Sequence, residues 1–403
     1  MDGGLTGHTE TTPAGDAVRA PAFSAMPPPC PRPMPEQVVS RTAAPALRAP
    51  ATGMRVRRRR MLVIGGTLAL GVAAIIQMSR VLEIGGMTPV EVLLLVLFSL
   101  SFTWIGLTLV TAIAGLAARL ARRTRKAAPA GLAPAGRTAM VMPAYNEQPE
   151  RIFAAIEAMV IEVAGTGHGE RFDWFVLSDT TDPEVALKEE AAFFEIRRRL
   201  CSAANVYYRR RRKNVARKPG NIADFCRRWG GAYDYMLVLD ADSLMDGKTI
   251  LEMVRRMEAD PRLGLLQSLP QIIGLSTLFG RLLQFATGLY GPYFARGLAA
   301  VQGKEGTFWG HNALIRTRAF AAACGMAPLT GKPPFGGHIL SHDTVEAALL
   351  ARDGWKVRLD PDLTGSYEEA PANMVDYAKR DRRWCQGNLQ HSRILAAPRF
   401  RFW

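Results

Sequence analysis

The chain has 403 residues, of which 48% are hydrophobic and 22% charged, so it is too long for a small disulfide-held module and can hold more than one domain. Its 51 lysines and arginines exceed its 36 acidic residues, and the net charge of +15 indicates an anionic partner such as nucleic acid, a lipid surface or a phosphorylated substrate. The five cysteines include no C-x-x-C pair, which favours neither a disulfide framework nor a zinc ribbon. A reducing compartment is therefore expected.

Residues 1–60 contain ten of the 26 prolines among many small residues. Such a composition cannot bury enough apolar surface to offset the entropy of ordering, so a disordered, Pro-rich cytoplasmic tail is predicted there. A cleaved signal peptide is not expected, because its apolar core would lie much nearer to Met1.

Two uncharged runs follow within residues 61–118 and predict two transmembrane helices. The first, residues 61–78, would measure about 27 Å as a helix, close to the thickness of the hydrocarbon core of a bilayer. The second, residues 92–118, has 27 residues without a charge, which exceeds most helices of a soluble core, although a core helix is the alternative.

Basic residues flank this pair of helices on both sides. Five arginines lie within residues 55–60, a basic linker is predicted over residues 119–136, and the connector at 79–91 carries one arginine and two glutamates. The positive-inside rule then places both flanks in the cytoplasm. Much of the positive charge is thereby explained by topology, and no nucleic-acid partner is expected.

From residue 137 to residue 403, apolar strands alternate with amphipathic helices. The expected strands are 138–142, 172–178, 204–208, 235–239 and 263–269, and the expected helices are 150–163, 219–229 and 248–258. This alternation predicts an α/β, Rossmann-like domain with a mostly parallel sheet. Ligands of such sheets bind beyond the carboxyl ends of the strands.

Polar residues stand at three of these strand ends. Tyr145 and Glu147 follow the first strand, Asp179 the second, and Asp240 and Asp242 the fourth. Each alone also fits a turn or a helix cap, but together they indicate one site. The two aspartates at i and i+2 suit a hard divalent cation such as Mg²⁺ or Mn²⁺.

A basic stretch with a glycine-bearing turn, residues 213–221, precedes the expected helix at 219–229. It predicts a cradle for a diphosphate, in which Lys218 supplies positive charge, while a solvated basic loop is the alternative.

These motifs, P-x-Y-N-E at 143–147, Asp179, K-x-G-N at 218–221 and D-x-D at 240–242, resemble those of the processive family 2 nucleotide-sugar glycosyltransferases, such as cellulose and hyaluronan synthases. Longer stretches, including FDWFVLSDTTDPEVALKEE, ARKPGNIADFCRRWG and YAKRDRRWCQGNLQH, are similar to the family of glucans biosynthesis glucosyltransferases, which make the backbone of osmoregulated periplasmic glucans. The resemblance extends from about Gly53 to Trp403.

The resemblance implies a GT-A-type, metal-dependent, inverting enzyme of the bacterial inner membrane with a cytoplasmic catalytic domain. It would transfer glucose from UDP-glucose to a growing β-1,2-glucan, with membrane lipid as a further partner. The implied donor-binding residues are Tyr145, Glu147, Asp179, Lys218, Asp240 and Arg383, and the implied metal ligands are Asp240 and Asp242.

The second half of the chain supplies the implied acceptor side. Asp343, in Ser-His-Asp where the family has Thr-Glu-Asp, is the candidate general base, with Glu346 as the alternative base and a helix cap as the structural alternative. Trp384 would stack on a sugar, or else anchor the chain at the membrane interface. Arg380 replaces the glutamine of the family motif. Gly310 and His311 resemble the segment near the acceptor.

Two further segments carry weaker signals. Residues 267–270 resemble the strand that lines the donor pocket. Residues 275–299 are apolar and aromatic with two arginines and predict an amphipathic segment in the plane of the lipid headgroups, while a partly buried core helix fits equally well.

Other interpretations stay open at this point. The chain could be another family 2 polysaccharide synthase, or an inactive, truncated, membrane-tethered UDP-binding fragment, because relatives continue into further transmembrane helices beyond Trp403. A membrane-tethered protein that binds nucleic acid or acidic lipid through residues 209–213 is a non-enzymatic alternative. The resemblance also suggests a periplasmic glucan-modifying protein and acyl carrier protein as partners.

Overall fold

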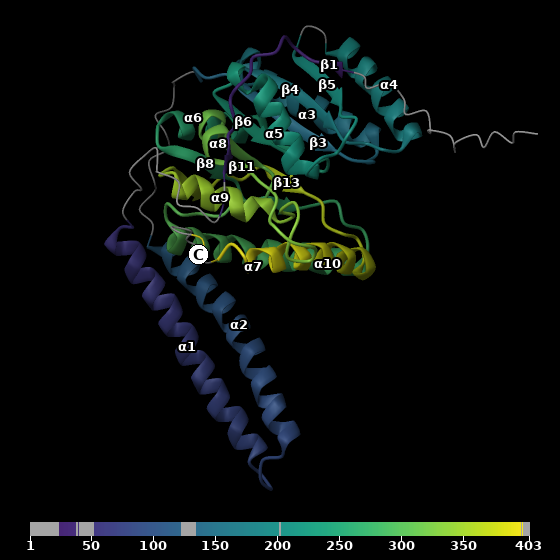
Figure 1. Ribbon diagram of the computed structural model, residues 1–403. Coiled ribbons are helices and arrows are strands. Elements are labelled where there is room, and N and C mark those ends of the chain that lie inside the picture. Colours follow the sequence, from purple (N-terminus) through teal and green to yellow (C-terminus); the bar gives the residue numbers. More distant parts are fainter. Residues whose placement is uncertain are drawn as a thin grey trace, which may run out of the picture.

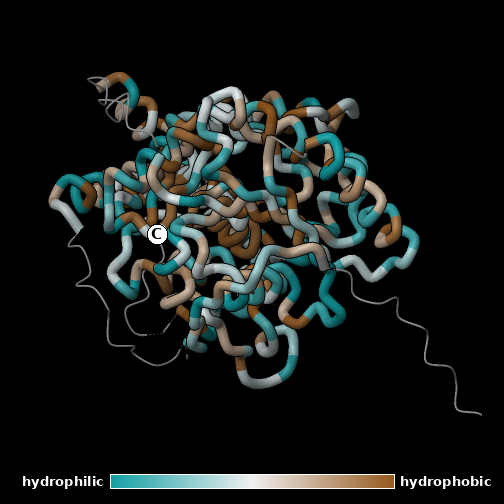
Figure 2. Tube along the Cα trace, turned by 90° about the horizontal axis from the view of Figure 1, so that it is seen from above, coloured by the Kyte–Doolittle hydropathy of each residue, from teal (hydrophilic) through white to brown (hydrophobic). Residues whose placement is uncertain are grey.

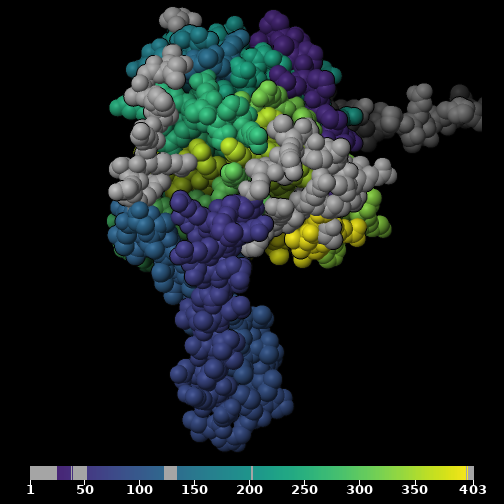
Figure 3. Space-filling model, turned by 90° about the vertical axis from the view of Figure 1, so that its left-hand side faces the viewer, coloured from purple at the N-terminus to yellow at the C-terminus, as the bar shows by residue number. Residues whose placement is uncertain are grey.

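The structure, a computed structural model, describes residues 24–37, 39, 52–121, 134–200, 203–395 and 397. It consists of an α/β domain and a hairpin of two long helices that leaves one side of this domain (Figure 1). In the side view the hairpin projects from the domain as a stalk (Figure 3).

The two helices of the hairpin are α1 (Met54–Leu82) and α2 (Pro89–Leu120), and both are longer than the predicted apolar runs. Helix α1 begins just before the arginine cluster at 55–60 and includes it, because arginine is a good helix former. Helix α2 begins with a capping box between Thr88 and Glu91. Both helices are long and apolar enough to cross a membrane, and only 17% and 6% of their most apolar windows are buried. This exposure favours membrane spans over core helices.

The main sheet has eight strands, in the order β1-β5-β4-β3-β6-β10-β8-β12. The four neighbours from β5 to β6 are parallel, β12 is parallel to β8, and β10 runs antiparallel between β6 and β8. Their bounds are β1 Ser24–Ala25, β5 Asn205–Arg210, β4 Phe172–Ser178, β3 Thr138–Ala144, β6 Tyr235–Val238, β10 Ala313–Arg316, β8 Leu263–Gln267 and β12 Lys356–Leu359. The predicted mostly parallel α/β class is confirmed.

Helices cover both faces of this sheet because alternate residues of each strand point to opposite sides. Ala139 and Val141 of β3 pack with α5, α8 and α9, while Met140 and Met142 pack with α3, α4 and α6. The helices are α3 Pro149–Ala164, α4 Pro183–Arg199, α5 Arg217–Trp229, α6 Gly247–Glu258, α7 Leu278–Gln302, α8 Thr317–Ala323, α9 His342–Arg352 and α10 Met374–His391. Hydrophobic segments accordingly gather in the centre of the domain (Figure 2).

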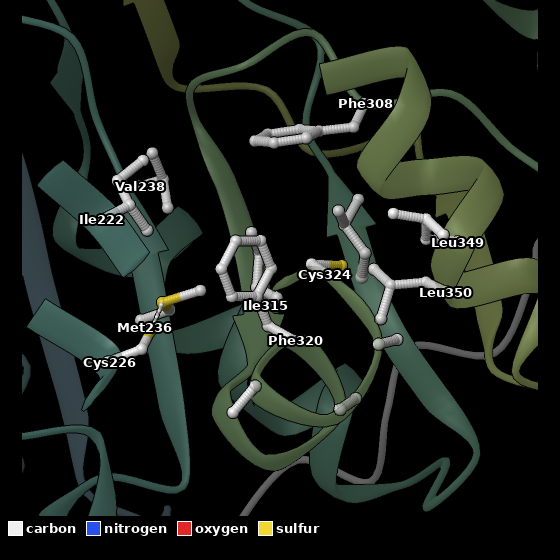
Figure 4. Close-up of a cluster of buried hydrophobic side chains, with 14 of the residues drawn as sticks. Ile222, Cys226, Met236, Val238, Phe308, Ile315, Phe320, Cys324, Leu349 and Leu350 are labelled. Carbon is white, nitrogen blue, oxygen red and sulfur yellow. Dashed lines mark hydrogen bonds between the residues drawn. The ribbon is translucent and has the colours of Figure 1, made fainter. Parts of the chain in front are cut away.

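Figure 4 shows the core on the first of these faces. Met236 and Val238 of β6 and Ile315 of β10 meet side chains of α5, α8 and α9 there. Leu349 and Leu350 bring α9 into this core. Packing on the sheet therefore fixes the position of the helix that carries the candidate base.

The remaining short elements border the sheet. A small sheet joins β7, β13 and β9, and β2 pairs with β11. Their bounds are β2 Glu36–Gln37, β7 Leu244–Met245, β9 Gln271–Ile272, β11 Gly325–Met326 and β13 Ser366–Glu368, and 3₁₀ turns lie at Gly169–Arg171 and Gly230–Ala232.

The N-terminal segment, residues 24–37, corrects the prediction of a disordered tail over residues 1–60. Its strand β1 pairs antiparallel with β5 and so covers the edge of the main sheet. Cys30 exchanges backbone hydrogen bonds with Arg228 and Gly231, and Met34 is buried. The prolines already hold extended backbone, which lowers the entropy lost on docking. Residues 1–23 lie outside the described residues, and residues 54–60 belong to α1.

The segment predicted at 275–299 forms helix α7, which is continuous through Pro292. It packs closely against α2, since a Cβ at Gly297 would overlap the carbonyl oxygen of Thr111 and one at Gly115 would overlap that of Tyr293. Figure 1 shows α7 and α10 along the side of the domain from which the hairpin leaves. The hairpin is thus joined to the domain by packed helices. The predicted location of this segment among lipid headgroups stays a prediction.

Candidate functional site

The carboxyl ends of β3, β4 and β6 meet at one edge of the sheet, because these strands are parallel neighbours. The backbone N–H of Asp179 donates to the carbonyl of Ala144 at 2.8 Å, which holds the ends of β4 and β3 together. Asp240, two residues beyond β6, donates its backbone N–H to the hydroxyl of Ser243 at 2.8 Å. The loops that carry Glu147, Asp179 and Asp240 therefore start side by side.

Lys218 and Asp240 form an ion pair at this edge. The lysine lies in the first turn of α5, and its Nζ also donates to the carbonyl oxygen of Gly310 at 2.8 Å. The side chains of Lys218 and Asp240 are 26% and 39% exposed, so a ligand can reach the pair. Burial by itself would raise the pKa of Asp240, but Lys218 and then His311 outweigh it and lower that pKa.

Asp242 and Glu147 carry negative charge that their surroundings do not fully compensate. Desolvation first, and repulsion by Asp240 second, raise the pKa of Asp242. Desolvation, then Asp242 and Asp240, raise the pKa of Glu147, although Arg151 and Arg383 act in the opposite direction. A cation at this edge would relieve this repulsion.

The donor set fits a divalent cation in part. Asp240 and Asp242 offer the carboxylate oxygens that such a cation prefers. The described residues contain no group of three or more His, Cys, Asp or Glu side chains arranged to hold a metal. Further ligands would therefore come from water or from the phosphates of a substrate.

The turn at Gly310 and His311 is held from β8. Gln267 accepts a hydrogen bond from the backbone N–H of Trp309 at 2.9 Å and donates to the carbonyl of His311 at 3.0 Å. His311 Nε2 lies 3.1 Å from Glu368 Oε2. Burial lowers the pKa of His311, but Asp240 and Glu368 outweigh it and raise that pKa. The two acidic neighbours therefore favour the protonated form of this imidazole.

Asp343 lies in the first turn of α9, where it is a helical residue and not the N-cap, which is Ser341. It lies near the Gly310 turn, because a Cβ at Gly310 would meet Asp343 Oδ2 at 3.6 Å. Glu346, the alternative base, is 1% exposed and lies 3.1 Å from His342 Nδ1. Asp343 is therefore the better-placed carboxylate.

Helix α10 carries the remaining predicted residues. Arg383 lies close enough to the site to act on the pKa of Glu147. Trp384 is 48% exposed, and the guanidinium of Arg380 lies 4.5 Å from the centre of its ring. Tyr145, beyond β3, is also exposed. The roles of Trp384 and Tyr145 in binding stay predictions.

Arg211 is a site residue that the sequence patterns did not predict. It follows β5 and binds the carboxylate of Asp179 through two hydrogen bonds of 2.6 Å. Its neighbours Arg209 and Arg210 pair with Asp224 and Glu190. Three arginines of the basic run at 209–213 thus face acidic partners within the domain, which weakens the interpretation that this run binds nucleic acid or acidic lipid.

The structure thus brings most of the predicted site residues to one sheet edge, with Asp179 one strand further along. The grouped residues are Glu147, Lys218, Asp240, Asp242, Gly310, His311, Asp343 and Arg383. A mostly parallel α/β sheet with a lysine and several carboxylates beyond its strand ends is an arrangement that suits a phosphorylated ligand and a divalent cation.

Comparison with known proteins points to glycosyltransferases. Residues 235–403 match the family model described as "Glycosyl transferase family group 2". The chain is 55% identical over 378 residues to glucans biosynthesis glucosyltransferase H of Shewanella oneidensis, covering 92% of this chain and 51% of that protein. It is 53% identical over 376 residues to the protein of the same name from Vibrio cholerae serotype O1, covering 92% and 52%.

Residues 235–403 are thus similar to family 2 glycosyltransferases, and most of the chain is similar to the proteins named glucans biosynthesis glucosyltransferase H. It spans about half the length of these relatives. Among solved structures, the mannosyltransferase PcManGT from Pyrobaculum calidifontis in complex with GDP-Man and Mn²⁺ has a TM-score of 0.44 and 18% identity, over 70% of this chain and 75% of that chain.

Proposed function

We propose that the chain transfers glucose from UDP-glucose to a hydroxyl group of a growing β-glucan. The observation that carries this proposal is that Lys218, Asp240 and Asp343 lie around the Gly310 turn. The lysine ammonium, a carboxylate that could hold a metal and the candidate base are therefore close together. The name of the homologues supports glucose as the sugar. The β-1,2 linkage rests on the resemblance to that family.

In this proposal, one group of residues would act on the departing diphosphate and another on the attacking hydroxyl group. Lys218 and Arg383 would compensate the negative charge of the departing diphosphate, and Asp240 and Asp242 would hold a divalent cation that stabilises the same charge. Asp343 would accept the proton of the attacking hydroxyl. The new bond to C1 of glucose then forms on the face opposite to the bond that breaks, which inverts the configuration at C1.

The same proposal includes the membrane. Helices α1 and α2 would cross the inner membrane, with their basic flanks and the domain from residue 137 onward in the cytoplasm. The exposed apolar side chains Leu282, Phe285 and Leu289 of α7 would contact lipid. The acceptor glucan would then grow next to the bilayer.

Membranes that contain the full chain test this activity with labelled UDP-glucose. Asp240→Asn and Asp343→Asn should each lower glucose incorporation by about 10²-fold or more. Asp234→Asn is the matched control, because Asp234 immediately precedes the same strand, β6, at its opposite end. Activity of Asp240→Asn and Asp343→Asn at the level of this control would overturn the proposal.

A panel of UDP-sugars and linkage analysis of the product would separate this function from that of another family 2 synthase. Binding of UDP without any transfer would instead support a membrane-tethered UDP-binding protein.

A further inference from the structure

Arg211 contacts both Asp179 and the turn that precedes Lys218. Its Nε and Nη2 each donate to one carboxylate oxygen of Asp179 at 2.6 Å. Its Nη1 donates to the carbonyl of Val215 at 3.2 Å, and Nη2 also donates to the carbonyl of Arg217 at 3.0 Å. One guanidinium therefore joins the end of β4 to the start of α5.

The pair is held in one orientation. The side chains of Arg211 and Asp179 are only 10% and 6% exposed, and a bidentate guanidinium–carboxylate pair fixes both planes. The side-chain amide of Asn214 also donates to the backbone carbonyl of Asp179. Asp179 is thus bound to this turn through its side chain and its main chain.

The turn itself depends on such support. Ala216 and Arg217 both have left-handed backbone, with φ of 56° and 51°, which residues with a side chain rarely adopt. The backbone of Val215 packs directly against α5, because a Cβ at Gly220 would overlap the carbonyl oxygen of Val215. Lys218 follows this turn directly and pairs with Asp240. The conformation of the turn therefore determines where the ammonium group of Lys218 lies.

We propose that Arg211 is a positioning residue that couples the two ends of the donor site: it orients Asp179 for the nucleobase and holds the turn that delivers Lys218 to the diphosphate. This inference rests on the proposed function and on the family resemblance, which implies that Asp179 binds the uridine part of UDP-glucose, while Lys218 would bind its diphosphate. Removing Arg211 should then disturb both ends together, whereas changes at Asp179 or Lys218 should each disturb one.

Binding of three nucleotides to the full chain in detergent tests the coupling. The ratio of the UDP and CDP dissociation constants reports the base end, and the ratio of the UDP and UMP constants reports the diphosphate end. Asp179→Asn should change only the first ratio, and Lys218→Met only the second. Arg211→Lys should change both by about tenfold, the scale of one charge-assisted hydrogen bond, because lysine keeps the charge but cannot make the bidentate pair.

Arg212→Lys is the matched control, since Arg212 is the exposed next residue of the same basic run and should change neither ratio. If Arg211→Lys leaves both ratios unchanged, or changes only one of them, the coupling is refuted. A uniform loss of affinity for all three nucleotides is a merely structural effect and also refutes it.

Hydrogen exchange provides a second test of the proposal that needs no nucleotide. The backbone amides of residues 214–218 and 220 should exchange at least about tenfold faster in Arg211→Lys than in Arg212→Lys, because the two carbonyl contacts are lost. Equal exchange in both variants overturns the proposal even if UDP binds. Absence of UDP binding by the unaltered chain, with faster exchange in Arg211→Lys alone, would refute the proposed function while retaining Arg211 as the support of the turn.

Discussion

Lys218 and Asp240 form an ion pair in which the lysine ammonium is shared with the backbone carbonyl oxygen of Gly310, 2.8 Å away. The ammonium group thus compensates much of the charge that Asp240 presents to Asp242. In the proposed function Asp240 and Asp242 would hold a divalent cation, and Lys218 would compensate the charge of the diphosphate. In the proposed function the ion pair would hold both charges in place before the donor binds.

The Lys218→Met variant should therefore require a higher pH for activity. In the unaltered chain the pKa of Asp240 is lowered, because Lys218 and His311 outweigh desolvation, so Asp240 stays ionised as the pH falls. Without the ammonium group, desolvation prevails and the pKa should rise. The acid limb of kcat/KM for UDP-glucose should move to higher pH, and KM should increase about tenfold or more.

Lys188→Met removes a lysine from the exposed surface of α4 and serves as the control for this shift. An acid limb that stays at the same pH in Lys218→Met as in Lys188→Met would show that the ion pair does not set the ionisation of Asp240.

A divalent cation should stabilise the folded chain, and more so at higher pH. The raised pKa values of Asp242 and Glu147 mean that, without a cation, their contribution to stability is present at low pH and is lost as the pH rises through those values. A cation at about 100 times its Kd should add about 2.7 kcal/mol to the free energy of unfolding. This gain should shrink on acidification as the ligands become protonated.

Thermal unfolding with Mg²⁺, Mn²⁺ and a chelator measures this effect. Asp242→Asn should abolish the cation-dependent shift in Tm, whereas Asp234→Asn at the far end of β6 should retain it. A shift that survives in Asp242→Asn, or that does not depend on pH, would place the cation elsewhere.

Because α2 packs against α7, alanine substitutions at two glycines of α7 should change stability in opposite directions. Gly297→Ala places a Cβ on the carbonyl oxygen of Thr111 and should cost about 1–3 kcal/mol of stability, because the helices must separate. Gly288→Ala meets nothing within 4 Å and should stabilise the helix by about 0.5–1 kcal/mol. Thermal unfolding in detergent compares them. Equal effects would mean that α2 and α7 do not pack as described.

The main elements could be predicted because their patterns are local. The strand at 172–178 and the helix at 248–258 differ from β4 and α6 by at most one residue. The first is a short run rich in aromatic residues, and the second has the apolar period of a helix. The segment at 24–37 could not be predicted in this way. Its few apolar residues become buried only against the distant strand β5 and helix α5, and composition alone does not reveal such a surface.

Some site residues could likewise be predicted from local sequence, and others could not. Asp240 and Asp343 stand in motifs at strand and helix ends, so their types and positions were visible in the sequence. Arg211 lies in a run of four arginines, and nothing local distinguishes the one that binds Asp179 from Arg212, which is exposed. That difference depends on the twist of β5 and on the path of the following turn, which are tertiary properties.

The N-terminal segment should contribute to the stability of the domain, and Met34 measures that contribution. Met34 is 7% exposed and belongs to the core beneath α5 and α8, so Met34→Ala should cost about 2 kcal/mol, at the low end for a buried methionine because a chain segment can partly close the cavity. Pro33→Ala, at the exposed neighbouring position, should cost much less. Denaturant unfolding of both variants gives the difference. If the two variants unfold alike, the segment does not dock, and β5 is an open edge that should also promote association between copies of the chain.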